Sequence, residues 1–228
     1  MNAITKHIPN AITCLNLFSG CMSAVASFNG DYKIAMYWIF AAAIFDFFDG
    51  FAARLLKAYS PMGKEMDSLA DCISFGFAPA IMLYSVLSTF ANFPEWIKYV
   101  AFLLAVFSAL RLAKFNIDER QTTSFIGLPT PANALFWITL INAYTTGSMP
   151  FELPEWVIVV LIPVFSYLLI SEIPMFSLKL KSLSVAKNKI LYSFLAIFLV
   201  LILIWGYFGV ALGMIFYVFL SALTAPKE

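Results

Sequence analysis

The chain has 228 residues, of which 62% are hydrophobic and 12% charged, with a formal net charge of +1 and a mean hydropathy of +0.87. A soluble domain averages about 25% charged residues, so this composition excludes an ordinary soluble protein and indicates a polytopic membrane protein. Neither a signal-peptide pattern nor a cysteine cluster with metal-ligand spacing is visible, and a nucleic-acid partner is not expected.

Apolar segments of about 20 residues, the length that crosses a hydrocarbon layer about 30 Å thick, follow one another along the chain. They predict an all-α bundle of about eight transmembrane helices, in one membrane domain over residues 1–228. The predicted spans are 10–28, 34–57, 65–90, 96–116, 131–148, 155–176, 189–208 and 210–224. Only Gly206–Gly209 separates the last two, so one long bent hairpin and two full spans both remain open.

The distribution of lysine and arginine predicts the orientation of the bundle. If the N-terminus is cytosolic, Lys33 and Lys98 are the only two of the 14 basic residues that fall on the opposite side. Basic residues concentrate on the cytosolic side of membrane proteins, so this bias predicts a cytosolic N-terminus. The compact chain favours a prokaryotic cytoplasmic membrane.

Four aspartates lie in the cytosolic halves of the second and third predicted spans. Asp46 and Asp49 are three residues apart, and Asp67 and Asp71 are four apart, so each pair shares one helix face. A short basic loop joins the two antiparallel helices, which lets all four carboxylates converge at one depth. Each carboxylate costs about 2.5–3.5 kcal/mol at the centre of a membrane helix, so a bound cation is expected.

Oxygen ligands of this kind favour hard cations such as Mg²⁺, Mn²⁺ or Ca²⁺, and four carboxylates can share two of them. Two metals can stabilise an in-line displacement at phosphorus. Arg54 suits a bidentate phosphate contact, while Gly50, Ala53 and Gly63 leave room for a nucleotide or pyrophosphate beside the helices. One carboxylate can act as a base toward an alcohol, and Asp71 is the predicted one.

Three other interpretations of the aspartates are possible. A buried ion-pair network without chemistry does not balance its charge, because only Arg54 is close in sequence. A cation pathway in a transporter would not need the interleaved glycines and arginine. A prenyltransferase also uses aspartates with Mg²⁺, but it needs two acidic motifs on separated helices, whereas here both lie on one hairpin.

The aspartates belong to one longer string: Asp46-x-x-Asp49-Gly50-x-x-Ala53-Arg54, eight residues, then Gly63-x-x-x-Asp67-x-x-x-Asp71. This string resembles the signature of the CDP-alcohol phosphatidyltransferases, membrane enzymes of phospholipid synthesis. Further segments resemble the phosphatidylserine synthase branch, namely 8–20, MDSLADCISFGFAPA at 66–80, 109–116 with 127–131, and 171–179. The resemblance covers a six-helix core over about 8–180, and residues 189–224 would add two C-terminal helices.

The resemblance implies transfer of a phosphatidyl group from CDP-diacylglycerol to the hydroxyl of L-serine, which gives phosphatidylserine and CMP, in an enzyme that is a homodimer. The four aspartates would hold Mg²⁺ or Mn²⁺, two ions in all, and Asp71 would take the serine proton. Gly50, Ala53, Arg54 and Gly63 would lie along the CDP moiety. Asn10, Thr13 and Asn16 form a polar stripe that either contacts the nucleotide or makes interhelical hydrogen bonds.

The acceptor site is predicted in the fourth loop. Free serine carries a carboxylate, an ammonium and a hydroxyl group, and Arg111, Lys114 and Asn116 could bind these groups beside the metals. Alternatively, Arg111 and Lys114 are only positive-inside anchors. Glycerol 3-phosphate and inositol phosphate are the alternative acceptors, although an acceptor phosphate calls for more cationic side chains.

Overall fold

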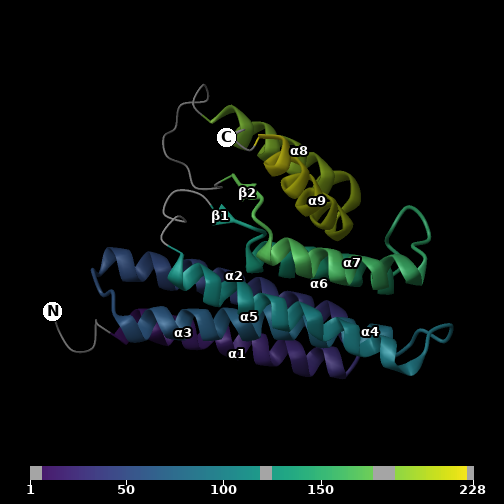
Figure 1. Cartoon of the computed structure of the whole chain (residues 1–228), viewed down its shortest axis with the longest axis horizontal. Coiled ribbons are helices and arrows are strands. Elements are labelled where there is room, and N and C mark those ends of the chain that lie inside the picture. The colour runs from purple at the N-terminus through teal and green to yellow at the C-terminus, as the bar shows by residue number, and fades with distance from the viewer. Residues whose placement is uncertain (1–6, 119–124, 177–187, 225–228) are drawn as a thin grey trace.

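The computed structural model describes residues 7–118, 125–176 and 188–224. These residues form a bundle of antiparallel helices (Figure 1), so the predicted all-α membrane architecture is confirmed. Within them, five helical stretches are long and apolar enough to cross a membrane: Ile8–Phe28, Tyr32–Leu55, Pro61–Leu87, Glu95–Ile117 and Tyr207–Thr224. Several residues behind the predicted orientation lie outside the described residues: Lys6, Arg120, Lys179, Lys181, Lys187 and Lys227.

The first half of the chain builds the part of the bundle that carries the aspartates. Helix α1 (Ile8–Phe28) packs along α2 (Tyr32–Leu55), and α3 (Pro61–Asp71) follows after a short loop. Ser60 caps α3, because its hydroxyl accepts a hydrogen bond from the Gly63 amide at 3.0 Å, and Pro61 occupies the first turn. A 3₁₀ segment (Glu95–Ala101) then leads into α5 (Phe102–Ile117).

The third transmembrane stretch contains one turn of π-helix, Cys72–Phe77, between α3 and α4 (Ala78–Leu87). Pro79 explains this turn, because proline has no N–H to donate to the preceding turn and its ring crowds the carbonyl four residues earlier. A wider turn accommodates both effects. It begins directly after Asp71, so the backbone changes its helical geometry next to a predicted metal ligand.

Helix α6 (Thr130–Thr145) occupies the centre of the bundle. It packs against α2, α4 and α9, and most of its side chains are buried. The rings of Phe136 on α6 and Phe165 on α7 (Glu155–Ile170) stack with centroids 3.9 Å apart. Neighbouring helices surround α6, so 11 of its 16 residues are buried.

The predicted span 155–176 is wrong at its end. Helix α7 stops at Ile170, and Pro174–Met175 forms the short strand β2, which pairs antiparallel with β1 (Phe125–Ile126). Pro174 disfavours helix at the residue before it and has no N–H to continue the helix. The pairing of β1 with β2 is extended by one hydrogen bond, which the Gly127 amide donates to the Ile173 carbonyl at 2.8 Å.

The C-terminal region forms two separate helices, α8 (Lys189–Trp205) and α9 (Tyr207–Thr224), with only Gly206 between them. Gly206 has a φ of +56°, a value that glycine adopts at little cost and that reverses the chain abruptly. The two helices fold back on each other as a hairpin, and of the two only α9 is among the described stretches that are long and apolar enough to cross a membrane. Helix α9 packs against α6, and α8 lies on the outside of α9 (Figure 1).

Candidate active site

Three of the predicted metal ligands converge where α2 and α3 lie together. One carboxylate oxygen from each of Asp46, Asp49 and Asp67 lies within 4.8 Å of the other two. Asp49 is buried, with 5% of its surface exposed, and Asp67 Oδ1 is a buried atom without a hydrogen-bond partner among the described residues. Buried carboxylates this close repel one another, so the arrangement fits a divalent cation bound through oxygen.

Helix α1 supplies hydrogen bonds to the other side of the aspartates. The Thr13 hydroxyl donates to Asp49 Oδ2 at 2.7 Å, and the Asn16 side-chain amide donates to Asp71 Oδ1 at 3.2 Å. Thr13 and Asn16 therefore make interhelical hydrogen bonds, one of the two possibilities for the polar stripe. Asn16 was not predicted as a site residue on its own, although its three-residue spacing from Thr13 was the signal that marked it.

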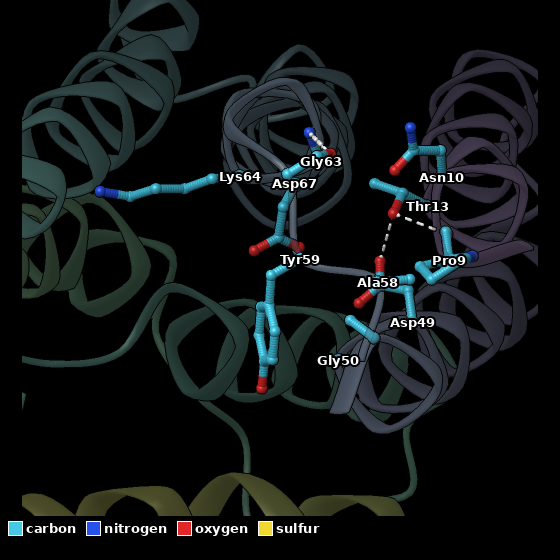
Figure 2. A pocket seen from close by; sticks show the side chains of 12 residues that line it. Pro9, Asn10, Thr13, Asp49, Gly50, Ala58, Tyr59, Gly63, Lys64 and Asp67 are labelled. Carbon is cyan, nitrogen blue, oxygen red and sulfur yellow. Dashed lines mark hydrogen bonds between the residues drawn. The ribbon is translucent and has the colours of Figure 1, made fainter. Parts of the chain in front are cut away.

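A small cavity of about 200 Å³ opens on one side of the aspartates, and Figure 2 shows its lining side chains. Helix α1 contributes Asn10 and Thr13, α2 contributes Gly50 and Ala53, and α3 contributes Gly63. These are five of the six residues predicted to bind CDP. Sequence reasoning missed Pro9 on α1 and four further lining residues in and after the short basic loop: Ala58, Tyr59, Ser60 and Lys64.

A larger cavity of about 570 Å³ opens on the other side. All four aspartates line it, together with Arg54 and Arg111, and the rest of its wall is mostly apolar and comes from α5, α6, α8 and α9. Asp49, Gly50 and Asp67 line both cavities. Asp49 and Asp67 thus stand between two cavities that each combine polar and apolar side chains, and a ligand with a charged centre could extend into both.

The structure separates the three residues predicted to bind serine. Arg111 lines the larger cavity, is 4% exposed, and donates from Nε to the Leu128 carbonyl at 3.0 Å. Lys114 instead forms an ion pair with Glu172, which follows the end of α7. The Asn116 side-chain amide donates to the Ser68 hydroxyl at 2.8 Å. Of the three, only Arg111 lines the larger cavity, and the predicted serine contacts remain predictions.

The comparisons with known proteins agree with this geometry. The family model of the CDP-alcohol phosphatidyltransferases matches residues 6–167. A protein of Mycobacterium tuberculosis named CDP-diacylglycerol–serine O-phosphatidyltransferase is 36% identical over 189 residues, which cover 79% of this chain and 64% of that protein. The chain therefore spans less than two thirds of the length of this relative.

Two further relatives come from other groups of organisms. The protein of the same name from Bacillus subtilis is 36% identical over 139 residues, which cover 61% of this chain and 77% of that protein. An archaetidylserine synthase of Methanothermobacter thermautotrophicus is 36% identical over 143 residues, which cover 61% of this chain and 58% of that protein.

The family match covers α1 to α6 and most of α7, and it includes the helices that carry the four aspartates. Asp49 and Asp67 line both cavities, and Asp46 and Asp71 line the larger one. The chain belongs to the CDP-alcohol phosphatidyltransferase family.

Proposed function

We propose that the protein transfers a phosphatidyl group from CDP-diacylglycerol to the hydroxyl of L-serine, and so produces phosphatidylserine and CMP. The observation that carries this proposal is the carboxylate cluster that borders both cavities. CDP-diacylglycerol has a charged pyrophosphate between a nucleoside and an apolar lipid, and the two cavities on either side of the cluster offer space for both parts. The printed names of the relatives support serine as the acceptor.

Asp46, Asp49, Asp67 and Asp71 would hold divalent cations, Mg²⁺ or Mn²⁺, two in number. The carboxylate set fits such ions because its donors are all oxygen and because Asp67 Oδ1 lacks a partner among the described residues. When bound, the ions neutralise phosphate charge and stabilise an in-line displacement.

Each cavity would bind a different part of the substrates. Gly50, Ala53, Gly63, Asn10 and Thr13 would surround the CDP moiety in the small cavity. Asn10 and Thr13 on α1 and Gly50 and Ala53 on α2 are small or uncharged, so they leave room for the nucleotide in this cavity.

On the other side, Arg54 would contact phosphate and Arg111 would bind the serine carboxylate. Asp71 would accept the proton of the serine hydroxyl. The serine oxygen would then form a bond to the phosphorus that carries diacylglycerol, and the bond from that phosphorus to the CMP oxygen would break. Lys114 and Asn116 would act at the edge of this site, through their bonds to Glu172 and Ser68.

The setting of this reaction also forms part of the proposal. The protein would lie in a prokaryotic cytoplasmic membrane as a homodimer, with its N-terminus and active site on the cytosolic side. Residues 1–228 would form one membrane domain, with a catalytic core over about 8–180 and the two helices over 189–224 added to it.

The test is CMP release from CDP-diacylglycerol by the purified protein with Mn²⁺ or Mg²⁺, with L-serine, glycerol 3-phosphate, inositol phosphate or water as acceptor. Release that requires both serine and a metal is the expected result. Release with a different acceptor would keep the site and change the substrate. If no acceptor supports release, the proposal is wrong and uptake of cations into vesicles becomes the next measurement.

A further inference from the structure

The wall of the larger cavity extends beyond the part of the chain that the family model matches. Five of its side chains come from the C-terminal helices: Phe194, Leu195 and Phe198 from α8, and Met214 and Tyr217 from α9. We infer that these two helices form the surface that binds an acyl chain of the lipid donor. This inference rests on the proposed function, because it names the part of the donor that the hairpin recognises.

Two kinds of side chain line the cavity. Asp46, Asp71 and Arg111 on α2, α3 and α5 provide charge, whereas Phe194, Phe198 and Met214 on α8 and α9 provide apolar surface. A ligand that fills this space needs a charged head and an apolar tail. The volume of the cavity, about 570 Å³, lies within the usual range of about 300–1,000 Å³ for ligand pockets.

Free serine does not account for the apolar part of the cavity. Its charged and polar groups would occupy the end near Arg111, and large aromatic side chains offer them no hydrogen bonds. Burial of apolar surface contributes about 25 cal/mol per Å², so an acyl chain gains from contact with this wall and serine does not. The chemistry of the wall therefore selects the lipid part of the donor.

The hairpin also provides a path from the cavity to the surrounding lipid. Leu195 lines the cavity and is 42% exposed. Other apolar residues of α8 are exposed as well, including Leu199 and Leu203. An acyl chain longer than the cavity could therefore leave beside Leu195 and enter the hydrophobic core of the membrane.

The position of α8 keeps this space open. Among the described helices, α9 is the main neighbour of α8, so α8 does not close directly onto α2 or α3. The rings of Phe194 and Phe198 stack with centroids 5.5 Å apart, and Phe194 also meets the Tyr217 ring at 5.8 Å. Tyr217 is held in turn, because its hydroxyl donates to the Phe176 carbonyl at 3.0 Å. The wall is thus a packed aromatic surface.

The first test measures binding without turnover. CDP-diacylglycerol that carries a diazirine in the middle of one acyl chain is illuminated with the full-length protein in phosphatidylcholine vesicles, and the labelled residues are identified by mass spectrometry. We expect label on Leu195, Phe198 or Met214 that excess unlabelled CDP-diacylglycerol removes. Label confined to lipid-facing residues such as Leu203, and insensitive to the competitor, would overturn the inference.

The second test uses two tryptophan substitutions on α8. Leu195 and Ile197 are both 42% exposed, but only Leu195 lines the cavity. We expect Leu195→Trp to raise the KM for CDP-dioleoylglycerol at least fivefold and to leave the affinity for CDP, which has no acyl chain, within twofold. Ile197→Trp should change neither value. Equal effects of the two substitutions on both ligands would contradict the inference.

These tests separate the inference from the proposed function. If the unaltered protein releases no CMP with serine but competitor-sensitive label still appears on the hairpin, the serine reaction fails and the acyl-chain site stands. If serine-dependent release occurs and the label is absent from the hairpin, the reaction stands and the acyl-chain site fails.

Discussion

The side-chain amide of Asn16 donates a hydrogen bond to Asp71 at 3.2 Å, and Asn16 is completely buried. The Ser74 hydroxyl donates to the Asn16 backbone carbonyl at 2.9 Å, so Asn16 joins α1 to the third transmembrane stretch both at Asp71 and three residues after it. The bond from Asn16 fixes the orientation of Asp71 Oδ1 beside the aspartate cluster. Asn16 is therefore a positioning residue for Asp71.

Replacing Asn16 with leucine should slow turnover while leaving donor binding nearly unchanged. A hydrogen bond to a charged group contributes about 1.5–3 kcal/mol, which corresponds to a decrease in kcat of about 10- to 150-fold. The matched control is Ser19→Ala, because the Ser19 hydroxyl bonds only to the Leu15 carbonyl of its own helix. An equal loss of kcat in both variants would mean that Asn16 acts through helix packing alone.

Asp71→Asn should abolish turnover and preserve binding of CDP-diacylglycerol. The amide cannot accept the proton of the acceptor hydroxyl, and general base catalysis contributes about 10²–10⁴-fold. Binding of CDP-diacylglycerol, measured by calorimetry in detergent, provides the second observable. Near-normal turnover would remove Asp71 from the role of base.

Arg111 and Lys114 should differ in their effect on serine. Arg111 lines the larger cavity, whereas Lys114 is paired with Glu172. We expect Arg111→Lys to raise the KM for serine about tenfold, because lysine keeps the charge and loses the bidentate geometry. Lys114→Ala should change this KM less than threefold. A larger effect for Lys114 than for Arg111 would move the acceptor site toward the end of α5.

Divalent cations should stabilise the folded protein as well as support its reaction. A ligand at 100 times its dissociation constant adds about 2.7 kcal/mol of stability, so Mn²⁺ should raise the Tm in a thermal melt and chelation should reverse the change. Asp49→Asn should reduce this shift, since it removes charge from the cluster. The same Tm shift in the variant and the unaltered protein would show that the ion binds elsewhere.

Gly20 should tolerate no larger side chain. A Cβ atom at this position would lie 2.6 Å from the Ser74 Cα atom, so α1 and the π-helical turn could not keep their present distance. Overpacking of this kind typically costs about 1–3 kcal/mol, and Gly20→Val should therefore lower the Tm. The neighbouring substitution Cys21→Val is the control, because Cys21 is exposed. Equal melting temperatures for both variants would contradict this packing argument.

The sequence predicted the helices well where length and hydropathy decide the structure. The stretch predicted as 65–90 corresponds to Pro61–Leu87, and the one predicted as 96–116 corresponds to Glu95–Ile117. It failed at residues 171–176, where Pro174 and pairing with a distant segment end the helix. The π-helical turn after Asp71 was also missed, because hydropathy does not distinguish one helical geometry from another.

At the site, spacing along two helices was enough to predict that Asp46, Asp49 and Asp67 come together, while Asp71 lies outside the group of three. It could not show that Lys114 is paired with Glu172, 58 residues away, because that contact depends on where the chain leaves α7. It could not show the apolar wall of the larger cavity either. Phe198 and Met214 belong to helices that carry no recognisable motif, and only their packing places them near the aspartates.

The packing of α6 against α9 has a consequence for how the protein is made. Helix α6 is surrounded by its neighbours and carries Asn133 and Asn142 in buried positions, yet one of those neighbours, α9, is translated about 60 residues later. In a nascent chain that has inserted only α1 to α7, the face of α6 that later packs against α9 contacts lipid or the insertion machinery until α9 is inserted. Assembly of the core therefore waits for the hairpin, and a ribosome that stalls before α9 leaves an unfinished bundle for membrane proteases to recognise.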